Sequence, residues 1–405
     1  MDFQVVILAG GFSSNLVLLF SKEVPKALLP VANRPVLSYV LDLLESSNLK
    51  DLIVVVEGED AALTVGGYGY LLPVLIAYML SIILENPVAA GALRAIAHHL
   101  TAKDILIVSG DIVSDISPGA AAATHRRHDA AVTAMLCAEP VRLDSSKQFL
   151  LYIATGVEVK RDTRLKKSIL CAAGKMEIRS DLMDSHIYAF KRSVLQEVLE
   201  QKPTCRCLKQ DVLPYLVRTQ LVSWIRNQMS SLTKKTVDKS GNGHGKNNMQ
   251  NNDVVSSQIL SNASLPTFHQ VYESGLDIRK THKCCVYIAD ESKYCVRLNS
   301  IQAFMDVNRD VGPHCMLGEG SQVGDKCSVK RSVIGRHCRI GSNVKVVNSV
   351  VMDHATIGDG CSIQGSVICS NAQLQERVSL RDCQVEAGYV VFAGGEHKGE
   401  TFARK

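Results

Sequence analysis

Residues 323–357 read VGDKCSVKRSVIGRHCRIGSNVKVVNSVVMDHATI, and this stretch decides the fold of the C-terminal third. Small or branched apolar residues recur in it, and on to residue 391, at steps of six, six and five residues. The series is Val323, Val329, Ile334, Ile340, Val346, Val351, Ile357, Ile363, Ile368, Leu374, Leu380, Val385 and Val391. These steps fit neither the 3.6-residue period of a helix nor the 2.0-residue period of a strand. They are typical of a triangular solenoid with one inward side chain per side, so the sequence predicts a parallel β-helix over residues 311–395.

Other positions keep the same 17-residue register. The serines that precede a valine in successive coils are Ser332, Ser349 and Ser366. Glycines at or near the expected corners, where a left-handed backbone is easily reached, are Gly324, Gly335, Gly341, Gly358 and Gly365. Such a solenoid leaves its ends and strand edges open, so we expect it to assemble with another subunit.

The N-terminal half alternates strand and helix signals. Residues 5–8, 52–56 and 104–108 are short apolar runs, as in strands that are buried on both faces. Apolar residues at helical spacing follow Pro35, and residues 92–100 also read as a helix. Strands separated by helices of this length pair in parallel, so we expect a Rossmann-like, doubly wound α/β domain over residues 1–225.

The composition changes after this domain. Residues 227–252 read NQMSSLTKKTVDKSGNGHGKNNMQNN and contain almost no large apolar groups. Burial of so few apolar groups does not offset the entropy that ordering would cost. We therefore expect a flexible polar linker over residues 226–262, a connecting segment over 263–310, and a short tail over 396–405 after the solenoid.

The overall composition excludes some classes of protein. The chain has 405 residues, 46% of them apolar, which excludes an intrinsically disordered protein. Its formal net charge of +5, spread over the whole chain, is too low for the concentrated positive charge of a nucleic-acid-binding surface. The 13 cysteines form no CxxC pair, and the first residues lack the basic region of a secretory signal. These features favour a cytosolic protein with no direct nucleic-acid partner.

One uncharged stretch, from Ala61 to Leu84, is long enough to raise the question of a membrane span. Three glycines and Pro73 interrupt its first half and leave an apolar run of 11 residues, Val74–Leu84. This run is shorter than the roughly 20 residues that a bilayer requires. We interpret it as a buried core helix and expect no membrane partner.

A glycine-rich turn follows the first predicted strand. Residues 8–11 read LAGG, residues 25–30 read PKALLP, and residues 109–111 read SGD. Such a turn at the carboxyl end of a parallel sheet lets backbone N–H groups approach the phosphates of a nucleotide. In this order the three strings resemble the nucleotide-diphosphate-sugar pyrophosphorylase family, in which a left-handed β-helix often follows the catalytic domain.

The resemblance implies roles for six residues. Leu8, Ala9, Gly10 and Gly11 correspond to the loop that wraps the triphosphate, Lys26 to a phosphate-binding lysine, and Asp111 to the aspartate that holds Mg²⁺. We expect these six residues to form at most a vestigial nucleotide-binding site, because the loop around them departs from the family pattern.

The departures affect the groups that neutralise charge. Ser13 stands in place of a glycine, Asn15 in place of the arginine and Leu18 in place of a proline. Residues 88–93, VAAGAL, also lack the glycine and the threonine of the family's GTAGAL segment. Loss of one preorganised donor costs on the order of 3 kcal/mol, or about a hundredfold in rate. We therefore interpret the domain as a nucleotidyltransferase-type fold without catalytic residues, bound metal or cofactor.

The chain also resembles the gamma and epsilon subunits of eukaryotic translation initiation factor 2B, whose loops are degraded in the same way. The matching strings, most similar to gamma subunits of the plant type, are VPKALLPVANRPVLSYVLDLLE at 24–45, DVLPYLVRTQ at 211–220 and GCSIQGSVICSNA at 360–372. This resemblance implies a co-catalytic subunit of a guanine-nucleotide exchange complex. Its partners would be the epsilon subunit, the other subunits of factor 2B, and GDP-bound initiation factor 2.

Alternatives remain open on the sequence alone. The first is a working sugar-1-phosphate nucleotidyltransferase of the GDP-mannose or ADP-glucose type with an atypical loop. A hexapeptide acyltransferase is disfavoured, because the inward columns show no histidine that could act as a general base. The candidate zinc ligands are His282, Cys284, Cys285 and Cys295, but their spacing favours inert thiols over a metal site.

Overall fold

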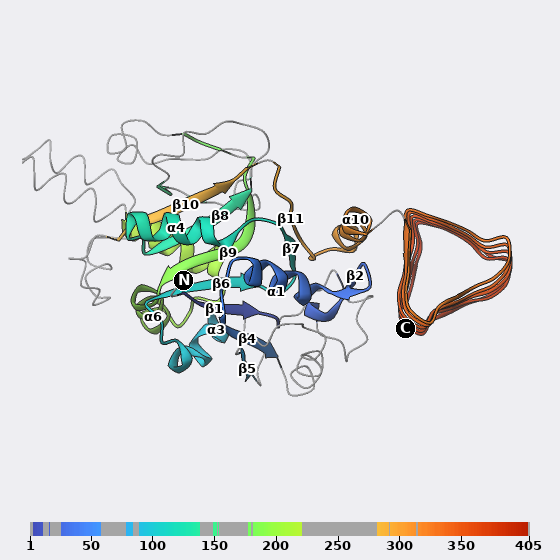
Figure 1. Cartoon of the computed structure of the whole chain (residues 1–405), viewed down its shortest axis with the longest axis horizontal. Helices are drawn as coiled ribbons and strands as arrows, with labels where there is room; N and C mark the ends of the chain where they lie inside the picture. The colour runs from blue at the N-terminus through green and yellow to red at the C-terminus, as the bar shows by residue number, and fades with distance from the viewer. Residues whose placement is uncertain are drawn as a thin grey trace, which may run out of the picture.

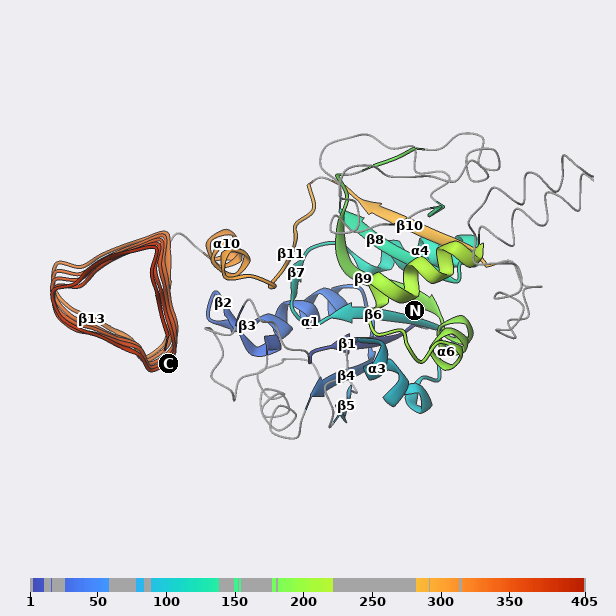
Figure 2. The same ribbon diagram turned by 180° about the vertical axis from the view of Figure 1, so that it is seen from behind.

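The computed structural model describes residues 3–10, 16, 26–57, 78–83, 89–137, 149–151, 153, 177–179, 181–220, 282–290, 292–312 and 315–403. An α/β domain lies at one end and a triangular solenoid at the other, with helix α10 (Ile301–Val311) between them (Figures 1 and 2). The linker predicted over residues 226–262 lies outside the described residues.

A seven-stranded mixed sheet forms the centre of the α/β domain, with the strand order β10-β8-β9-β6-β1-β4-β5. Its strands are β1 (Phe3–Leu8), β4 (Asp51–Glu57), β5 (Tyr78–Ile83), β6 (Asp104–Ser109), β8 (Val132–Cys137), β9 (Met183–Lys191) and β10 (Cys284–Ala289). Strands β5, β4, β1 and β6 are parallel to one another, and β10 is parallel to β8. Strand β9 runs antiparallel to both of its neighbours. The strands predicted from the apolar runs at 5–8, 52–56 and 104–108 are confirmed as β1, β4 and β6.

Helices cover both faces of this sheet (Figure 1). They are α1 (Val36–Ser46), α3 (Ala89–Ala95), α4 (Pro118–His128) and α6 (Arg192–Gln201), with short turns η2 (Lys26–Leu28), η4 (Ala97–His99) and η5 (Leu208–Val212). Helices α1 and α4 pack on one face, and α3 and α6 pack on the other. In β1, Val5 and Ile7 join the first core and Val6 joins the second. Because both faces are buried, the central residues of β1, β4 and β6 are apolar, from Val5 to Leu8, Leu52 to Val56 and Ile105 to Val108.

The structure differs from three expectations. The run Val74–Leu84 contains strand β5 instead of a core helix; short apolar runs suit both elements, and parallel pairing with β4 decides for a strand. Within the predicted connecting segment, β10 joins the sheet because its side chains pack beside β8. Within the predicted tail, residues 396–402 add two strands to the solenoid. No helix of the described residues is long and apolar enough to cross a membrane.

Three parallel sheets form the sides of the solenoid (Figure 1). The first has β12 (Cys315–Leu317), β15 (Ser332–Ile334), β18 (Val350–Val351), β21 (Val367–Ile368), β24 (Gln384–Val385) and β27 (Thr401–Phe402). The second has β13 (Gln322–Val323), β16 (Arg339–Ile340), β19 (Thr356–Ile357), β22 (Gln373–Leu374) and β25 (Val390–Val391). The third has β14 (Ser328–Lys330), β17 (Lys345–Val347), β20 (Ser362–Gln364), β23 (Ser379–Arg381) and β26 (Glu396–Lys398). Ile340 pairs with Ile357, and Ile357 with Leu374, so the predicted 17-residue register is confirmed.

A ladder of buried serines ties successive coils together. Ser332 Oγ accepts a hydrogen bond from Ser349 N at 3.1 Å, and Ser349 Oγ accepts from Ser366 N at 3.2 Å. Each hydroxyl also donates to a carbonyl two residues earlier, as Ser349 does to Val347 O at 2.8 Å. The hydroxyls therefore satisfy the N–H groups of the buried Ser349 and Ser366.

The Ser349→Ala variant is expected to lose about 1–3 kcal/mol of unfolding free energy from the solenoid, the cost of one buried group left unsatisfied. It removes the acceptor of Ser366 N, whereas Val347 O keeps its hydrogen bond from Gly365 N at 3.0 Å. Urea unfolding followed by circular dichroism measures the loss. The control is Ser362→Ala on the exposed surface of β20, where the loss should stay within about 0.5 kcal/mol. Equal losses of unfolding free energy in the two variants would contradict the stabilising role of the serine ladder.

The solenoid and the α/β domain meet at a hairpin and a small apolar cluster. The hairpin consists of β2 (Pro30–Val31) and β3 (Arg34–Pro35). At its turn, where Ala32 and Asn33 have left-handed backbones, Asn33 Nδ2 donates to Ile334 O at 2.9 Å. Ala32 N donates to Oδ1 of the buried Asn308 in α10 at 2.9 Å. The apolar contacts include Leu29, Val31, Phe304, Val307, Val350 and Met352. The first sheet of the solenoid is therefore the side that faces the α/β domain.

Candidate functional site

The candidate site lies at the carboxyl ends of β1 and β6. Gly110, directly after β6, donates its N–H to Leu8 O at 2.8 Å. A Cβ on residue 110 would lie only 2.9 Å from the Cα of Ala9, so this close approach requires glycine. The ends of the two strands are thus held together where the sequence predicted a phosphate-binding turn.

Only part of the predicted loop belongs to the described residues. Leu8, Ala9 and Gly10 are described, as are Lys26 and Asp111. Positions outside the described residues are Gly11, Ser13, Asn15 and Leu18. The site is therefore built here from its two ionic groups and their neighbours.

Asp111 is the centre of a buried ion cluster. Its carboxylate accepts hydrogen bonds from Lys26 Nζ and Ser109 Oγ. Arg297 Nε lies 3.1 Å from Oδ1 and 3.0 Å from Oδ2 of the same carboxylate. Asp111 is 5% exposed and Lys26 is 8% exposed, so two cations neutralise a carboxylate with little access to water.

Two distant segments bring the cations to this carboxylate. Lys26 begins η2, and Arg297 ends strand β11 (Cys295–Arg297). Strand β11 pairs antiparallel with β7 (Ile112–Ser114), which starts directly after Asp111. Leu298 N then donates to the Asp111 carbonyl at 2.8 Å. Backbone pairing thus sets Arg297 beside Asp111.

The charges of the cluster alter its pKa values. Burial alone would raise the pKa of Asp111, but the positive charges of Arg297 and Lys26 outweigh burial and hold this pKa below its ordinary value. Burial lowers the pKa of Lys26, although the charge of Asp111 acts in the opposite direction. The carboxylate of Asp111 is therefore compensated inside the cluster, where two basic side chains face one acidic side chain.

The residues present do not fit the Mg²⁺ site that the family resemblance implies. Mg²⁺ requires several oxygen ligands in near-octahedral geometry, but both oxygens of Asp111 already contact donors. Two neighbouring cations would also repel a divalent ion. Among the described residues, no group of three or more His, Cys, Asp or Glu side chains is arranged to hold a metal.

A second polar group adjoins the cluster at the same edge of the sheet. His186 Nε2 lies 3.4 Å from Arg297 Nη1, and His186 N donates to Asp184 Oδ1 at 2.9 Å. The hydroxyl of Tyr188 also donates to Asp184, and Lys209 Nζ lies 3.4 Å from the same carboxylate. The polar contacts thus extend from Lys26 through Asp111 and Arg297 to Asp184.

Comparison with known proteins agrees with this architecture. Residues 5–202 match the family model of a MobA-like NTP transferase domain, and residues 300–395 match that of the EIF2B subunit epsilon LbH domain. The chain is 25% identical over 401 residues to the translation initiation factor eIF2B subunit gamma of Dictyostelium discoideum, covering 83% of this chain and 88% of that protein. It is 27% identical over 357 residues to the same subunit of Schizosaccharomyces pombe, covering 81% and 74%.

Over most of its length the chain is therefore similar to two eIF2B gamma subunits. The predicted α/β domain of nucleotidyltransferase type, followed by a left-handed parallel β-helix, is confirmed. The coarse function is that of a translation initiation factor subunit.

Sequence reasoning missed three residues at this site. Arg297, Asp184 and His186 belong to none of the motifs described above. The left-handed backbone of His186, at φ 57°, and the shifted pairing register between β8 and β9 mark the position in the structure. In the sequence, a charged Arg at the end of a short strand was the one available signal.

The pH dependence of stability should reveal His186. Burial lowers its pKa to about 4, although the charge of Asp184 opposes this shift. Below about pH 6.5 the unfolded chain takes up a proton that the folded chain does not, so stability falls as the pH falls towards 4. Replacement of His186 by Asn, which tolerates a left-handed backbone, should reduce the loss between pH 7 and pH 4.5 by about 2–3 kcal/mol. Urea unfolding at the two pH values measures it.

The matched control is His337→Asn, because His337 is exposed and has the same left-handed backbone, at φ 54°. That variant should keep the pH dependence of the parent chain. If His186→Asn also keeps it, the buried imidazole does not titrate as described.

The candidate zinc ligands have separate surroundings in the structure. His282 Nε2 lies 2.9 Å from Thr219 Oγ1, whereas Cys295 Sγ contacts Ser185 O at 4.0 Å. Cys284 and Cys285 are fully buried in β10, and burial raises the pKa of both thiols. Their surroundings are those of core thiols.

One expectation about the solenoid needs correction: His397 does lie in an inward column, in register with Leu380. The predicted series of inward residues ended at Val391, before His397 and Phe402 of the last coil. His397 belongs to the last described coil, where its Nδ1 lies 2.9 Å from Glu400 Oε2. The absence of an inward histidine is therefore not an argument against an acyltransferase.

Proposed function

We propose that this chain acts within eIF2B beside the epsilon subunit, promotes GDP release from initiation factor 2, and has no working nucleotidyltransferase site. Both relatives are named gamma subunits of eIF2B, and the match covers most of each chain. From the names of these two relatives we infer that this chain is also a subunit of eIF2B.

The ion cluster at Asp111 supports the proposal that the nucleotidyltransferase-type site has no catalytic activity. Nucleotidyl transfer depends on positioning and on neutralising charge in the transition state. In this chain the carboxylate that should hold the metal is already neutralised by Lys26 and Arg297. Among the described residues, Asp111 therefore has no carboxylate oxygen without a contact to offer the metal that the reaction needs.

An exchange factor needs no nucleophile. It accelerates release of GDP only if it binds the nucleotide-free state of its GTPase more tightly than the loaded state. This difference arises from surfaces held in a fixed relative position. A chain whose α/β domain and solenoid are joined by direct contacts suits such a role.

The cluster also supports the fixed arrangement of the two parts. Lys26 lies four residues before the β2–β3 hairpin, which contacts the solenoid at Ile334. Arg297 lies four residues before α10, which packs on the same solenoid sheet. Both cations therefore anchor segments that lead directly to the solenoid, and Asp111 joins them.

A nucleotidyltransferase assay tests the proposal against its main alternative. The purified chain is mixed with GTP or ATP, a hexose 1-phosphate and Mg²⁺, and pyrophosphate release is measured. We expect no release above the protein-free blank. Release at enzymatic rates that disappears in the Asp111→Asn variant would establish the nucleotidyltransferase instead.

An exchange assay tests the positive half of the proposal. Release of labelled GDP from initiation factor 2 is followed with epsilon alone and with epsilon plus this chain. We expect the chain to bind epsilon and to increase the rate. An unchanged rate, with no complex on gel filtration, would refute the role beside epsilon.

A further inference from the structure

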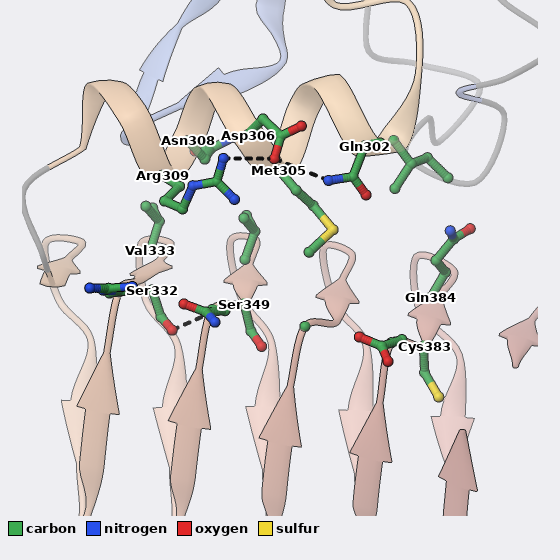
Figure 3. Close-up of a pocket in the computed structure, with 16 residues that line it drawn as sticks. Gln302, Met305, Asp306, Asn308, Arg309, Ser332, Val333, Ser349, Cys383 and Gln384 are labelled. Atoms are coloured by element: carbon green, nitrogen blue, oxygen red, sulfur yellow. Dashed lines mark hydrogen bonds and ion pairs between the residues drawn. The ribbon is translucent and has the colours of Figure 1, made fainter. Parts of the chain in front are cut away.

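A groove of about 630 Å³ runs between α10 and the first sheet of the solenoid. Figure 3 shows α10 lying across four coils, with Gln302, Met305 and Arg309 pointing towards them. The C-terminal part of the helix, with Arg309, lies over Ser332 and Val333, and its N-terminal part, with Gln302, lies towards Cys383 and Gln384. The groove is thus parallel to the solenoid axis and is lined by one coil after another.

One corner of the solenoid forms the outer lip of this groove. Its residues, one per coil, are Arg331, Asn348, Gly365 and Asp382, all with left-handed backbones. Three of them are exposed, and Gly365 leaves a gap in the lip. Met305 of α10 and the buried Val350 of the second coil make the middle of the groove apolar, and Val333 lies beside Arg331 at its first coil. The lining therefore changes along its length from a cation, through an apolar centre, to an anion.

The two end charges have no ion-pair partner within the described part of the chain. Arg309, by contrast, lies 2.9 Å from Asp306 and 3.3 Å from Asp310, so it is already compensated. Asp306 also accepts from Gln302 Nε2 at 3.0 Å. This leaves Arg331 and Asp382 as the charges available to a ligand.

The spacing of these two charges matches an extended peptide. Arg331 and Asp382 are three coils apart, which at the usual distance between strands is about 14 Å. Residues i and i+4 of an extended chain point to the same face and are also about 14 Å apart. Residue i+2, on the same face, would lie over the apolar centre.

We propose that this groove binds an extended segment of a partner protein with an acidic and a basic side chain four residues apart and an apolar side chain midway between them. The acidic group pairs with Arg331 and the basic group with Asp382. The side-chain amides of Asn348, Gln302 and Gln384 each offer a donor or an acceptor to the backbone of the segment. The segment binds along the solenoid axis between α10 and the corner.

Three synthetic peptides test the charge pattern on the full chain: Glu-Ser-Leu-Ser-Lys, Glu-Ser-Leu-Ser-Glu and Lys-Ser-Leu-Ser-Lys, each with a fluorescein label. Binding is followed by fluorescence anisotropy at low and at physiological salt, because exposed ion pairs weaken with salt. We expect the first peptide to bind about fivefold more tightly than the other two at low salt, as one exposed ion pair allows.

Charge-reversal variants must change this order in a defined way. Arg331→Glu makes both ends acidic and should favour the Lys/Lys peptide, whereas Asp382→Lys should favour the Glu/Glu peptide. Both substitutions are at exposed corners, and Lys326 shows that lysine adopts the same left-handed backbone in this solenoid. Asp382→Asn, which retains the backbone preference, should remove the discrimination at that end.

The matched control is Arg377→Glu, at an exposed left-handed position outside the groove, which should keep the order of the parent chain. The peptide Glu-Ser-Leu-Ser-Ser-Lys places its charges on opposite faces and should bind no better than the mismatched peptides. Coincident melting curves establish that the variants are folded. No binding of any peptide, or one order of affinity shared by all folded variants, would overturn the proposal. Neither result bears on nucleotide exchange, so the two proposals fail separately.

Discussion

The Asp111→Asn variant is expected to lose about 3–5 kcal/mol of unfolding free energy from the α/β domain. The substitution removes the one negative charge that lies between Lys26 and Arg297. Lys26 is 8% exposed, so its ammonium group would be left buried without a counterion. Urea unfolding followed by circular dichroism measures the change.

The control for this prediction is the same substitution in an exposed ion pair. Asp42 Oδ2 lies 2.7 Å from Arg34 Nη2, and both side chains are about half exposed. Asp42→Asn should therefore cost at most about 1 kcal/mol. If both variants lose the same free energy, the cluster at Asp111 is not buried and compensated as described.

The pH dependence of the same variant gives an independent test. The folded-state pKa of Asp111 lies below its ordinary value, so the carboxylate contributes stability above about pH 4. That contribution disappears as the pH falls through the folded-state pKa. The difference in unfolding free energy between the parent chain and Asp111→Asn should accordingly shrink in acid, and a difference that stays constant down to pH 2 would contradict the ion pairing.

Truncation inside the solenoid should have an effect of similar size. Leu380 is fully buried on β23, in register with Ile363 on one side and His397 on the other. Leu380→Ala is expected to cost about 3–5 kcal/mol, because it removes apolar contacts and leaves a cavity in a closely packed column. The unfolding transition of the solenoid should therefore shift to lower urea concentration.

The first coil supplies the matched control. Leu317 is 53% exposed, since no described coil covers its outer side. Leu317→Ala should cost less than about 1 kcal/mol. A similar cost at both leucines would mean that burial along the solenoid does not follow the inward column.

The sequence predicted the solenoid well because each coil contacts mainly the coils before and after it. Ile340, Ile357 and Leu374 stack because they are 17 residues apart, and that distance can be counted in the sequence. The last coil was missed since His397 is polar and did not extend the apolar series. Strand β5 was missed because a short apolar run does not by itself distinguish a strand from a core helix.

The site could be predicted only in part. Gly10, Lys26 and Asp111 were found from strings near strand ends, and the structure does bring Lys26 to Asp111. Their role in nucleotide binding stays a prediction. Arg297 is 186 residues from Asp111 in the sequence, and its approach depends on the pairing of β7 with β11. No periodicity connects residues so far apart.

The amino-acid sequence by itself determined the repeat, the register and the inward column of the solenoid, as well as the alternating order of the α/β domain, because these follow from local spacing. The tertiary structure alone decided which cations neutralise Asp111, which side of the solenoid faces the α/β domain, and where Arg331 and Asp382 lie along one groove. These features depend on contacts between segments distant in the chain, and the energy of a buried charge is set by the groups that folding places around it.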